Sequence, residues 1–133
     1  NITVAVSSMK DDTSFSELNI CRMKFKITNN AFAAIEKVDL DLVAFDDRGR
    51  KIKSNMMTSA SNSKGFSYQV IPVGSFVDGV GDFTVEEECK YVAKLVLDDV
   101  KNHNCSMRML PEDVDCKDIV VLKSNIDTIS VDK

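Results

Sequence analysis

The sequence contains no tryptophan, a single histidine and two prolines, and none of its apolar runs is long enough to cross a membrane. A transmembrane helix needs about 18 or more consecutive apolar residues, so we expect no membrane insertion. The chain has 17 lysines and arginines against 21 aspartates and glutamates, which gives a net charge of −4. Without a basic excess, the protein has no electrostatic field to hold a phosphate backbone or an anionic membrane. We therefore expect no nucleic-acid partner.

Signatures of catalysis are also missing from the sequence. There is no Gly-x-Ser-x-Gly, no His-Glu-x-x-His and no glycine-rich loop that could bind a phosphate. The only histidine, His103, stands two positions before Cys105, and the two could form a nucleophile pair only if Cys105 were a free thiol. Asp39 and Asp41 alternate with apolar residues, which indicates a solvated strand face. We predict that the protein is not an enzyme and has no catalytic residues, metal site or cofactor.

Length and composition indicate one packed domain. The 133 residues fall in the size range of single domains, and 44% of them are hydrophobic and 29% charged. The sequence shows no internal repeat and no low-complexity linker. We predict a single domain over residues 1–133. A short strand is expected at residues 2–6 and a loop from Met9 onward, so residues 1–17 leave room for a flexible N-terminal segment.

Apolar and polar residues alternate in several short segments. In residues 21–27, four apolar side chains alternate with three basic ones, a period of two that is typical of an antiparallel strand with one solvated face. Residues 35–45, 65–71, 75–85 and 91–97 show related patterns, with turn residues between them. About seven or eight such short strands predict an all-β protein. Its architecture would be an antiparallel β-sandwich of the immunoglobulin-like type, or an open barrel.

The four cysteines favour an oxidising compartment. An even number of cysteines in a small chain is typical of a disulfide framework, and disulfides persist outside the cytosol. Zinc ligation and free buried thiols are the alternatives, but no two cysteines form the close Cys-x2-Cys pair of a zinc site. The first residues are Asn-Ile-Thr-Val, which we interpret as a mature product whose signal peptide has been removed, a truncated product being the alternative. We predict a periplasmic or secreted protein with disulfides among Cys21, Cys89, Cys105 and Cys116.

Two linked motifs resemble a family of small exported alphaproteobacterial proteins. The first motif is Cys21-x-Met23-x-Phe25-x-Ile27-x-Asn29, and the second is Val38-x-Leu40-x-Leu42-x-Ala44-Phe45-Asp46-x-x-Gly49. A later segment from Cys89 to Cys105 also fits the family pattern, so the resemblance covers about residues 19–105. It implies a periplasmic or secreted β-sandwich of unknown function. Cys116 and the residues after it lie outside the resemblance.

Four cysteines allow three disulfide connectivities, and the sequence alone does not choose among them. In the family pattern, Cys89 and Cys105 flank one strand, whose ends would lie about 30 Å apart at about 3.3 Å per residue. The Cα atoms of a disulfide must lie within about 7 Å of each other, which disfavours a Cys89–Cys105 bond. We favour Cys21–Cys89 together with Cys105–Cys116, and the other two connectivities stay open.

Methionine-rich segments are the only sequence feature that suggests a binding surface. Methionine is adaptable at binding surfaces, although it also fills gaps in cores. We predict a non-enzymatic protein-binding module, one form of which is a secreted effector; the alternative is a small-ligand carrier with a cavity between its sheets. The candidate binding residues are Met56, Met57, Met107, Arg108, Met109 and Leu110.

Overall fold

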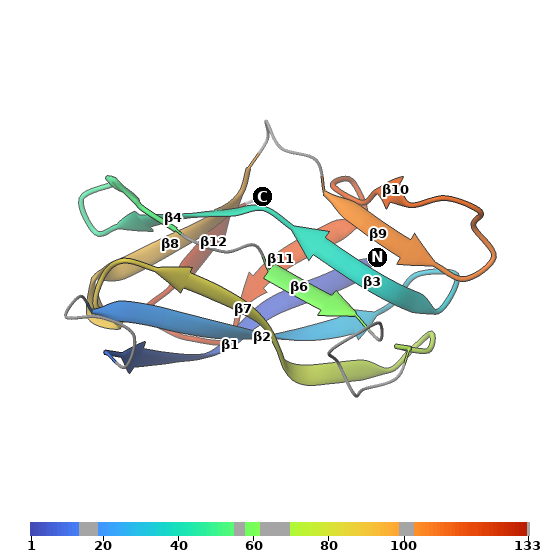
Figure 1. Cartoon of the computed structure of the whole chain (residues 1–133), viewed down its shortest axis with the longest axis horizontal. Coiled ribbons are helices and arrows are strands. Elements are labelled where there is room, and N and C mark those ends of the chain that lie inside the picture. Colours follow the sequence, from blue (N-terminus) through green and yellow to red (C-terminus); the bar gives the residue numbers. More distant parts are fainter. Residues whose placement is uncertain (14–18, 55–57, 62–69, 99–102, 133) are drawn as a thin grey trace.

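The computed structural model describes residues 1–13, 19–54, 58–61, 70–98 and 103–132, and it confirms the predicted all-β class with a sandwich-like architecture (Figure 1). One short 3-10 turn, η1 (Cys89–Tyr91), is present. None of the helices in the described part could cross a membrane. The strands are β1 (Ile2–Asp12), β2 (Ile20–Asn29), β3 (Ile35–Leu40), β4 (Leu42–Asp46), β5 (Lys51–Ile52), β6 (Thr58–Ser61), β7 (Phe76–Val85), β8 (Val92–Leu97), β9 (Asn104–Met107), β10 (Val114–Asp115), β11 (Val120–Ser124) and β12 (Ser130–Asp132).

The strands form two layers. One layer is a four-stranded sheet in the order β11-β1-β2-β7. The other layer consists of two smaller sheets, β10-β9-β3-β6 and β12-β8-β4-β5, which lie side by side above the first (Figure 1). Only Asp41 separates β3 from β4, so one stretch of chain passes from one small sheet into the next. Most pairs are antiparallel as predicted, but β1 pairs with β11, and β8 with β12, in parallel.

Alternating burial explains why the strands pack as they do. In β2 every second side chain is buried, from Cys21 to Asn29, while the side chains between them are half-buried. This period of two places one face of β2 against the opposite layer. The largest fully buried side chains, Phe25 and Phe83, lie on adjacent strands of the larger sheet and fill the space between the layers.

The N-terminal segment differs from the prediction. Strand β1 continues to Asp12, through the region expected to be a loop, and it lies between β2 and β11 in the larger sheet. The strand expected at residues 2–6 is therefore present, and the loop expected from Met9 is wrong for residues 9–12. The register between β1 and β2 shifts between Val6 and Ser8. This irregularity allows β1 to continue beyond Val6, where its residues become polar. Residues 14–18 lie outside the described part.

Two other segments test the predicted strands. Strand β7 matches the strand expected at residues 75–85, and it lies at the edge of its sheet. Gly79 and Gly81 adopt positive φ angles of 71° and 76°, next to the register shifts between β2 and β7. Most of the strand expected at residues 65–71 lies outside the described residues, but Ile71 forms a bridge with Ile35. The strand count exceeds seven or eight partly because the expected strand at 35–45 is divided at Asp41.

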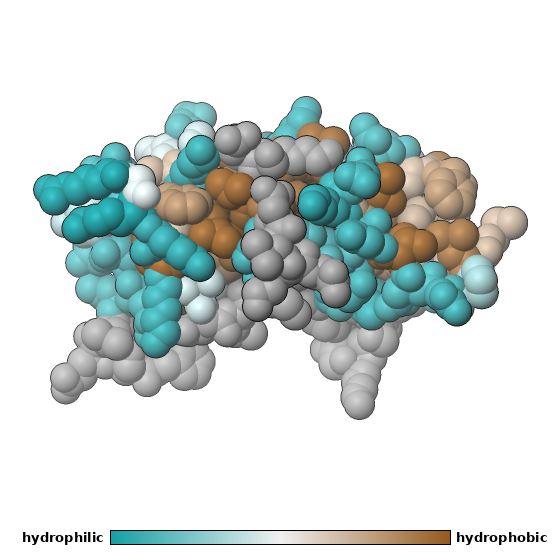
Figure 2. All heavy atoms as spheres, turned by 90° about the horizontal axis from the view of Figure 1, so that it is seen from above, coloured by the Kyte–Doolittle hydropathy of each residue, from teal (hydrophilic) through white to brown (hydrophobic). Residues whose placement is uncertain are grey.

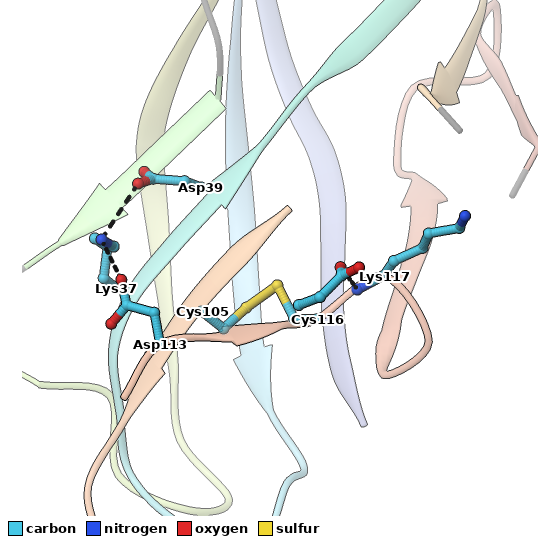
Figure 3. The surroundings of a disulfide bond; sticks show 7 residues. Lys37, Asp39, Cys105, Asp113, Cys116 and Lys117 are labelled. Atoms are coloured by element: carbon cyan, nitrogen blue, oxygen red, sulfur yellow. Dashed lines mark hydrogen bonds and ion pairs between the residues drawn. A yellow bond between two sulfur atoms is a disulfide. The ribbon is translucent and has the colours of Figure 1, made fainter. Parts of the chain in front are cut away.

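Both disulfides have the favoured connectivity. Cys21 is bonded to Cys89 with their Cα atoms 4.8 Å apart, and Cys105 is bonded to Cys116 at 5.6 Å. The second bond joins β9 to the segment after β10, and close to it Lys37 lies between the carboxylates of Asp39 and Asp113 (Figure 3). The first bond links the start of β2 to η1. Each disulfide therefore attaches a segment outside the main strands to a strand of the core.

Candidate binding surface at one end of the sandwich

Large exposed apolar side chains are concentrated at one end of the molecule. Among the described residues, five large hydrophobic side chains are exposed: Phe32 (73%), Val73 (55%), Phe76 (58%), Tyr91 (44%) and Met109 (93%). Phe32, Val73 and Met109 lie on connections, and Phe76 is the first residue of β7. These segments meet at the right-hand end in Figure 1, where β2 and β9 finish and β3 and β7 begin. In Figure 2 apolar residues reach the outline at this end, whereas hydrophilic residues cover the opposite end. We call Phe32, Val73, Phe76 and Met109 the apolar end.

A buried asparagine holds two of these connections in place. The side chain of Asn29 is fully buried at the end of β2. Its Nδ2 donates hydrogen bonds of 2.9 Å to the carbonyl oxygens of Ala33 and Ile71, and its Oδ1 accepts one of 2.9 Å from the backbone N–H of Ala31. A buried amide with all these bonds made is rigid, because breaking any of them would leave a polar group unsatisfied in the core. Asn29 therefore fixes the loop that carries Phe32 relative to the segment before Val73.

Backbone hydrogen bonds complete this end of the molecule. Asn29 donates its backbone N–H to Ser75 at 2.9 Å and accepts from Gly74 at 2.7 Å, so the turn around Val73 is tied to β2. Gly74 adopts a φ of 81°, which suits glycine in a tight turn. The backbone N–H of Arg108 donates to Ala34 at 2.9 Å and brings the segment after β9 to the loop of Phe32. The apolar side chains thus project from three connections with fixed backbones.

Met109 occupies a strained backbone position. It has a φ of 74°, the only positive φ of a non-glycine residue in the described part of the chain. A left-handed conformation costs such a residue about 1 kcal/mol or more, and strain of this kind is concentrated at functional sites. The turn is closed by a 3.3 Å hydrogen bond from the N–H of Leu110 to the carbonyl of Met107. The result is that Met109 projects into solvent while Met107 remains inside.

Two cations lie beside the apolar side chains. The Nζ of Lys26 is 4.2 Å from the ring centroid of Phe76, close enough for a cation–π interaction. Arg108, next to Met109, is exposed and forms no ion pair among the described residues. Two cationic side chains, Lys26 and Arg108, therefore lie at the apolar end.

The predicted methionine surface is only partly correct. Met107 is wrong as a surface residue, because its side chain is buried beside Cys105, two positions earlier on the same face of β9. Leu110 is half-buried against the core, whereas Arg108 and Met109 are exposed. Met56 and Met57 lie outside the described residues. Of the predicted binding residues, Arg108 and Met109 are therefore the two that are exposed at the apolar end.

Sequence reasoning missed Phe32, Val73 and Phe76. Phe32 and Val73 carry a signal that sequence reasoning could have used, because a large apolar residue in a turn has no strand face to bury it. Phe32 follows the Asn29-Asn30 break, and Val73 stands between Pro72 and Gly74, two residues that favour turns. Phe76 is the first residue of β7, and it lies outward beside Lys26.

His103 and Cys105, the one histidine–cysteine pair considered from the sequence, have structural positions. Cys105 is oxidised in its disulfide with Cys116. His103 is fully buried, and its Nε2 lies 3.2 Å from the carbonyl oxygen of Asp41. His103 therefore supports the point where β3 passes into β4. In the described part of the chain, no three histidine, cysteine, aspartate or glutamate side chains form a group that could hold a metal ion.

Comparisons with protein families, with curated proteins and with solved structures find no match to this chain. The resemblance to small exported alphaproteobacterial proteins stays a prediction.

Proposed function

We propose that this protein is an exported, non-enzymatic binding module whose apolar end inserts into an apolar pocket on a protein partner. The observation that carries the proposal is the concentration of Phe32, Val73, Phe76 and Met109 at one end of the sandwich. Asn29 holds the two segments that carry the first three, and the hydrogen bond from Arg108 to Ala34 holds the segment of Met109. Contiguous exposed apolar surface is unfavourable in water and usually marks an interaction site. Aromatic side chains presented on a rigid backbone are effective anchors, because little conformational entropy is lost when they bind.

The chemistry of the partner follows from the cations beside the apolar end. Lys26 and Arg108 would be matched by carboxylates at the rim of the partner's pocket. Complementary rim charges raise the rate of association and exclude wrong partners, while the buried apolar anchors supply most of the affinity. A protein pocket with an acidic rim is therefore favoured over an anionic membrane, which the net charge of −4 would repel.

The proposed location rests on the disulfides. Cys21–Cys89 and Cys105–Cys116 both form, and structural disulfides persist in the periplasm or outside the cell. The alternative of a carrier with a cavity between the sheets stays a prediction; no observation favours it, because large side chains such as Phe25 and Phe83 occupy that space.

Site-directed photo-crosslinking tests the proposal. A benzophenone amino acid would replace Phe32, and a control protein would carry it in place of Asn125, an exposed residue outside the apolar end. Irradiation in a periplasmic or extracellular extract should give a covalent adduct with one protein from position 32 and none from position 125. The adduct should disappear when Phe76→Ser and Met109→Ser are added. Adducts of equal yield at both positions, adducts with lipid, or adducts with a second copy of the chain would refute the proposal.

A further inference from the structure

A second surface feature lies at the end of the molecule opposite the apolar end. It is a hollow of about 230 Å³ lined by the turn that joins β4 to β5 and by the segment from the end of β7 through η1. The turn and the end of β7 lie at the left-hand end of Figure 1. Tyr91, the exposed aromatic residue that does not belong to the apolar end, lines it. The other lining residues are Asp46, Asp47, Arg48, Arg50 and Glu87.

Both walls of the hollow are fixed. On one side, the Asp46 carboxylate accepts hydrogen bonds from the backbone N–H groups of Arg48 at 2.9 Å and Arg50 at 2.8 Å, and from the Arg50 side chain at 3.0 Å. On the other side, Cys89 is anchored by its disulfide to Cys21. A 2.9 Å hydrogen bond from the backbone N–H of Glu86 to the carbonyl of Lys53 joins the two walls. The hollow is therefore preformed.

The hollow contains polar groups that the fold does not use. Neither the Arg48 guanidinium nor the Asp47 carboxylate forms an ion pair or a side-chain hydrogen bond within the described residues. By contrast, Asp46 and Arg50 are committed to the turn. The Nζ of Lys90 lies 5.1 Å from the ring centroid of Tyr91, so one face of this ring has a neighbour while the side chain remains 44% exposed. Unused donors and acceptors beside an aromatic ring are what a ligand would need.

These groups point to a neutral polyhydroxylated ligand. Three carboxylates and two guanidinium groups line the hollow, so it suits neither an anion nor a cation. Arginine only donates hydrogen bonds and a carboxylate only accepts them, whereas a hydroxyl group does both. Neighbouring hydroxyls can therefore bond to Arg48 and Asp47 at once, with the C–H face of a sugar ring against Tyr91. The volume is below the roughly 300–1,000 Å³ typical of pockets for drug-sized ligands, which indicates a single sugar unit.

We propose that this hollow binds one neutral sugar unit, such as the terminal residue of a glycan. The inference does not depend on the proposed protein partner, because the two surfaces lie at opposite ends of the sandwich and share no residue. An open hollow of this size should bind a free monosaccharide with a Kd on the order of 1 mM.

Amide chemical shifts measured by NMR during a titration with methyl glycosides of glucose, mannose and galactose would test this. At least one neutral glycoside should shift the amides of residues 46–50 and 87–91 with saturation. Arg48→Gln and Tyr91→Ser should each weaken binding by about tenfold, as expected for loss of a charged hydrogen bond or a stacking surface. Tyr91→Phe keeps the ring and should bind, and Phe32→Ser should bind as the wild type does.

Glucosamine, glucuronate and glycine serve as the charged and zwitterionic comparisons. No saturable shift with any neutral glycoside up to about 50 mM, well above the expected Kd, would overturn the proposal. Stronger binding of the charged or zwitterionic compounds would overturn it as well, as would shifts that Arg48→Gln and Tyr91→Ser leave unchanged. Spectra of the free variants with wild-type dispersion show that the fold is intact before any loss of binding is interpreted.

Discussion

The Nδ2 of Asn29 donates a 2.9 Å hydrogen bond to the carbonyl of Ile71, a residue 42 positions away. This bond links the end of β2 to the segment before β7, and a second bond from the same atom reaches Ala33. One buried amide thus fixes two connections that carry exposed apolar side chains. The rigidity of the apolar end is therefore built into the core, and it can be tested without knowing the partner.

Asn29→Ala should destabilise the protein by about 2–3 kcal/mol. The substitution removes three hydrogen bonds and leaves the carbonyl of Ala33 and the N–H of Ala31 without their side-chain partner, whereas the carbonyl of Ile71 keeps its bond from the N–H of Ile35. Lost hydrogen bonds and unsatisfied groups of this kind carry the cost. Urea unfolding followed by circular dichroism measures the change. The control is Asn125→Ala at an exposed position, where a change of about 0.5 kcal/mol or less is expected. Equal effects at the two positions would refute a structural role for Asn29.

Met107 and Met109 should respond oppositely to substitution. Met107→Ala removes a fully buried side chain and should cost about 2–4 kcal/mol. Met109→Gly should leave stability unchanged or raise it by about 1 kcal/mol, because glycine adopts the φ of 74° without strain. Thermal and urea unfolding of both variants provide the comparison. A large loss of stability in Met109→Gly would contradict the exposed position of this side chain.

Removing the two disulfides should have unequal effects. The Cys21–Cys89 bond spans 68 positions and the Cys105–Cys116 bond spans 11. In the chain-entropy account, the longer loop gives a stabilisation of about 4 kcal/mol and the shorter one about 3 kcal/mol. We expect the variant with Cys21→Ser and Cys89→Ser to unfold at lower urea concentration than the variant with Cys105→Ser and Cys116→Ser. The reverse order would show that native-state packing outweighs the effect on the unfolded chain.

Acid should weaken the turn between β4 and β5. Hydrogen bonds from the backbone N–H of Arg50, and then from that of Arg48 and the Arg50 side chain, hold the pKa of Asp46 below its ordinary value. A carboxyl group with a lowered folded pKa stabilises the folded state above its unfolded pKa of about 3.9, and this contribution is lost as pH falls through the folded pKa. Asp46→Asn should therefore flatten the dependence of stability on pH below about pH 5.

Urea unfolding at a series of pH values measures this effect. Asp127→Asn, at an exposed carboxylate with no side-chain partner among the described residues, serves as the matched control and should keep the slope of the wild type. If Asp46→Asn and the wild type lose stability in parallel below pH 5, the turn does not depend on the ionised carboxylate.

Local alternation predicted most strands because one face of each is buried. Alternation also indicates that Met107 is buried together with Cys105, because residues two positions apart on a strand share a face. The break at Asp41 was not visible in the sequence. The carbonyl of Asp41 accepts a hydrogen bond from the N–H of Asp98 and lies next to the ring of His103, and these residues are distant in sequence. Only the assembled fold brings those groups together.

The candidate site was harder to predict than the fold. Phe32 lies after β2, whereas Val73 and Phe76 lie before and at the start of β7, and nothing in the local sequence indicates that these two segments meet. Their common position depends on Asn29, whose side chain bonds to the distant residue Ile71. An asparagine in a turn can equally bond to the backbone of its own loop, so the sequence does not reveal the distant partner. The hollow beside Tyr91 likewise combines residues from two connections that are distant in the sequence.

The central claim is that the apolar end binds a protein, and the affinity of the crosslinked partner tests it most directly. Titration calorimetry would compare the wild type, Phe32→Ser and Tyr91→Ser against that partner. An anchoring aromatic residue accounts for about 2 kcal/mol or more, so Phe32→Ser should weaken binding by about 30-fold or more, and Tyr91→Ser should leave it unchanged. An unchanged Kd for Phe32→Ser in a folded protein would contradict the claim.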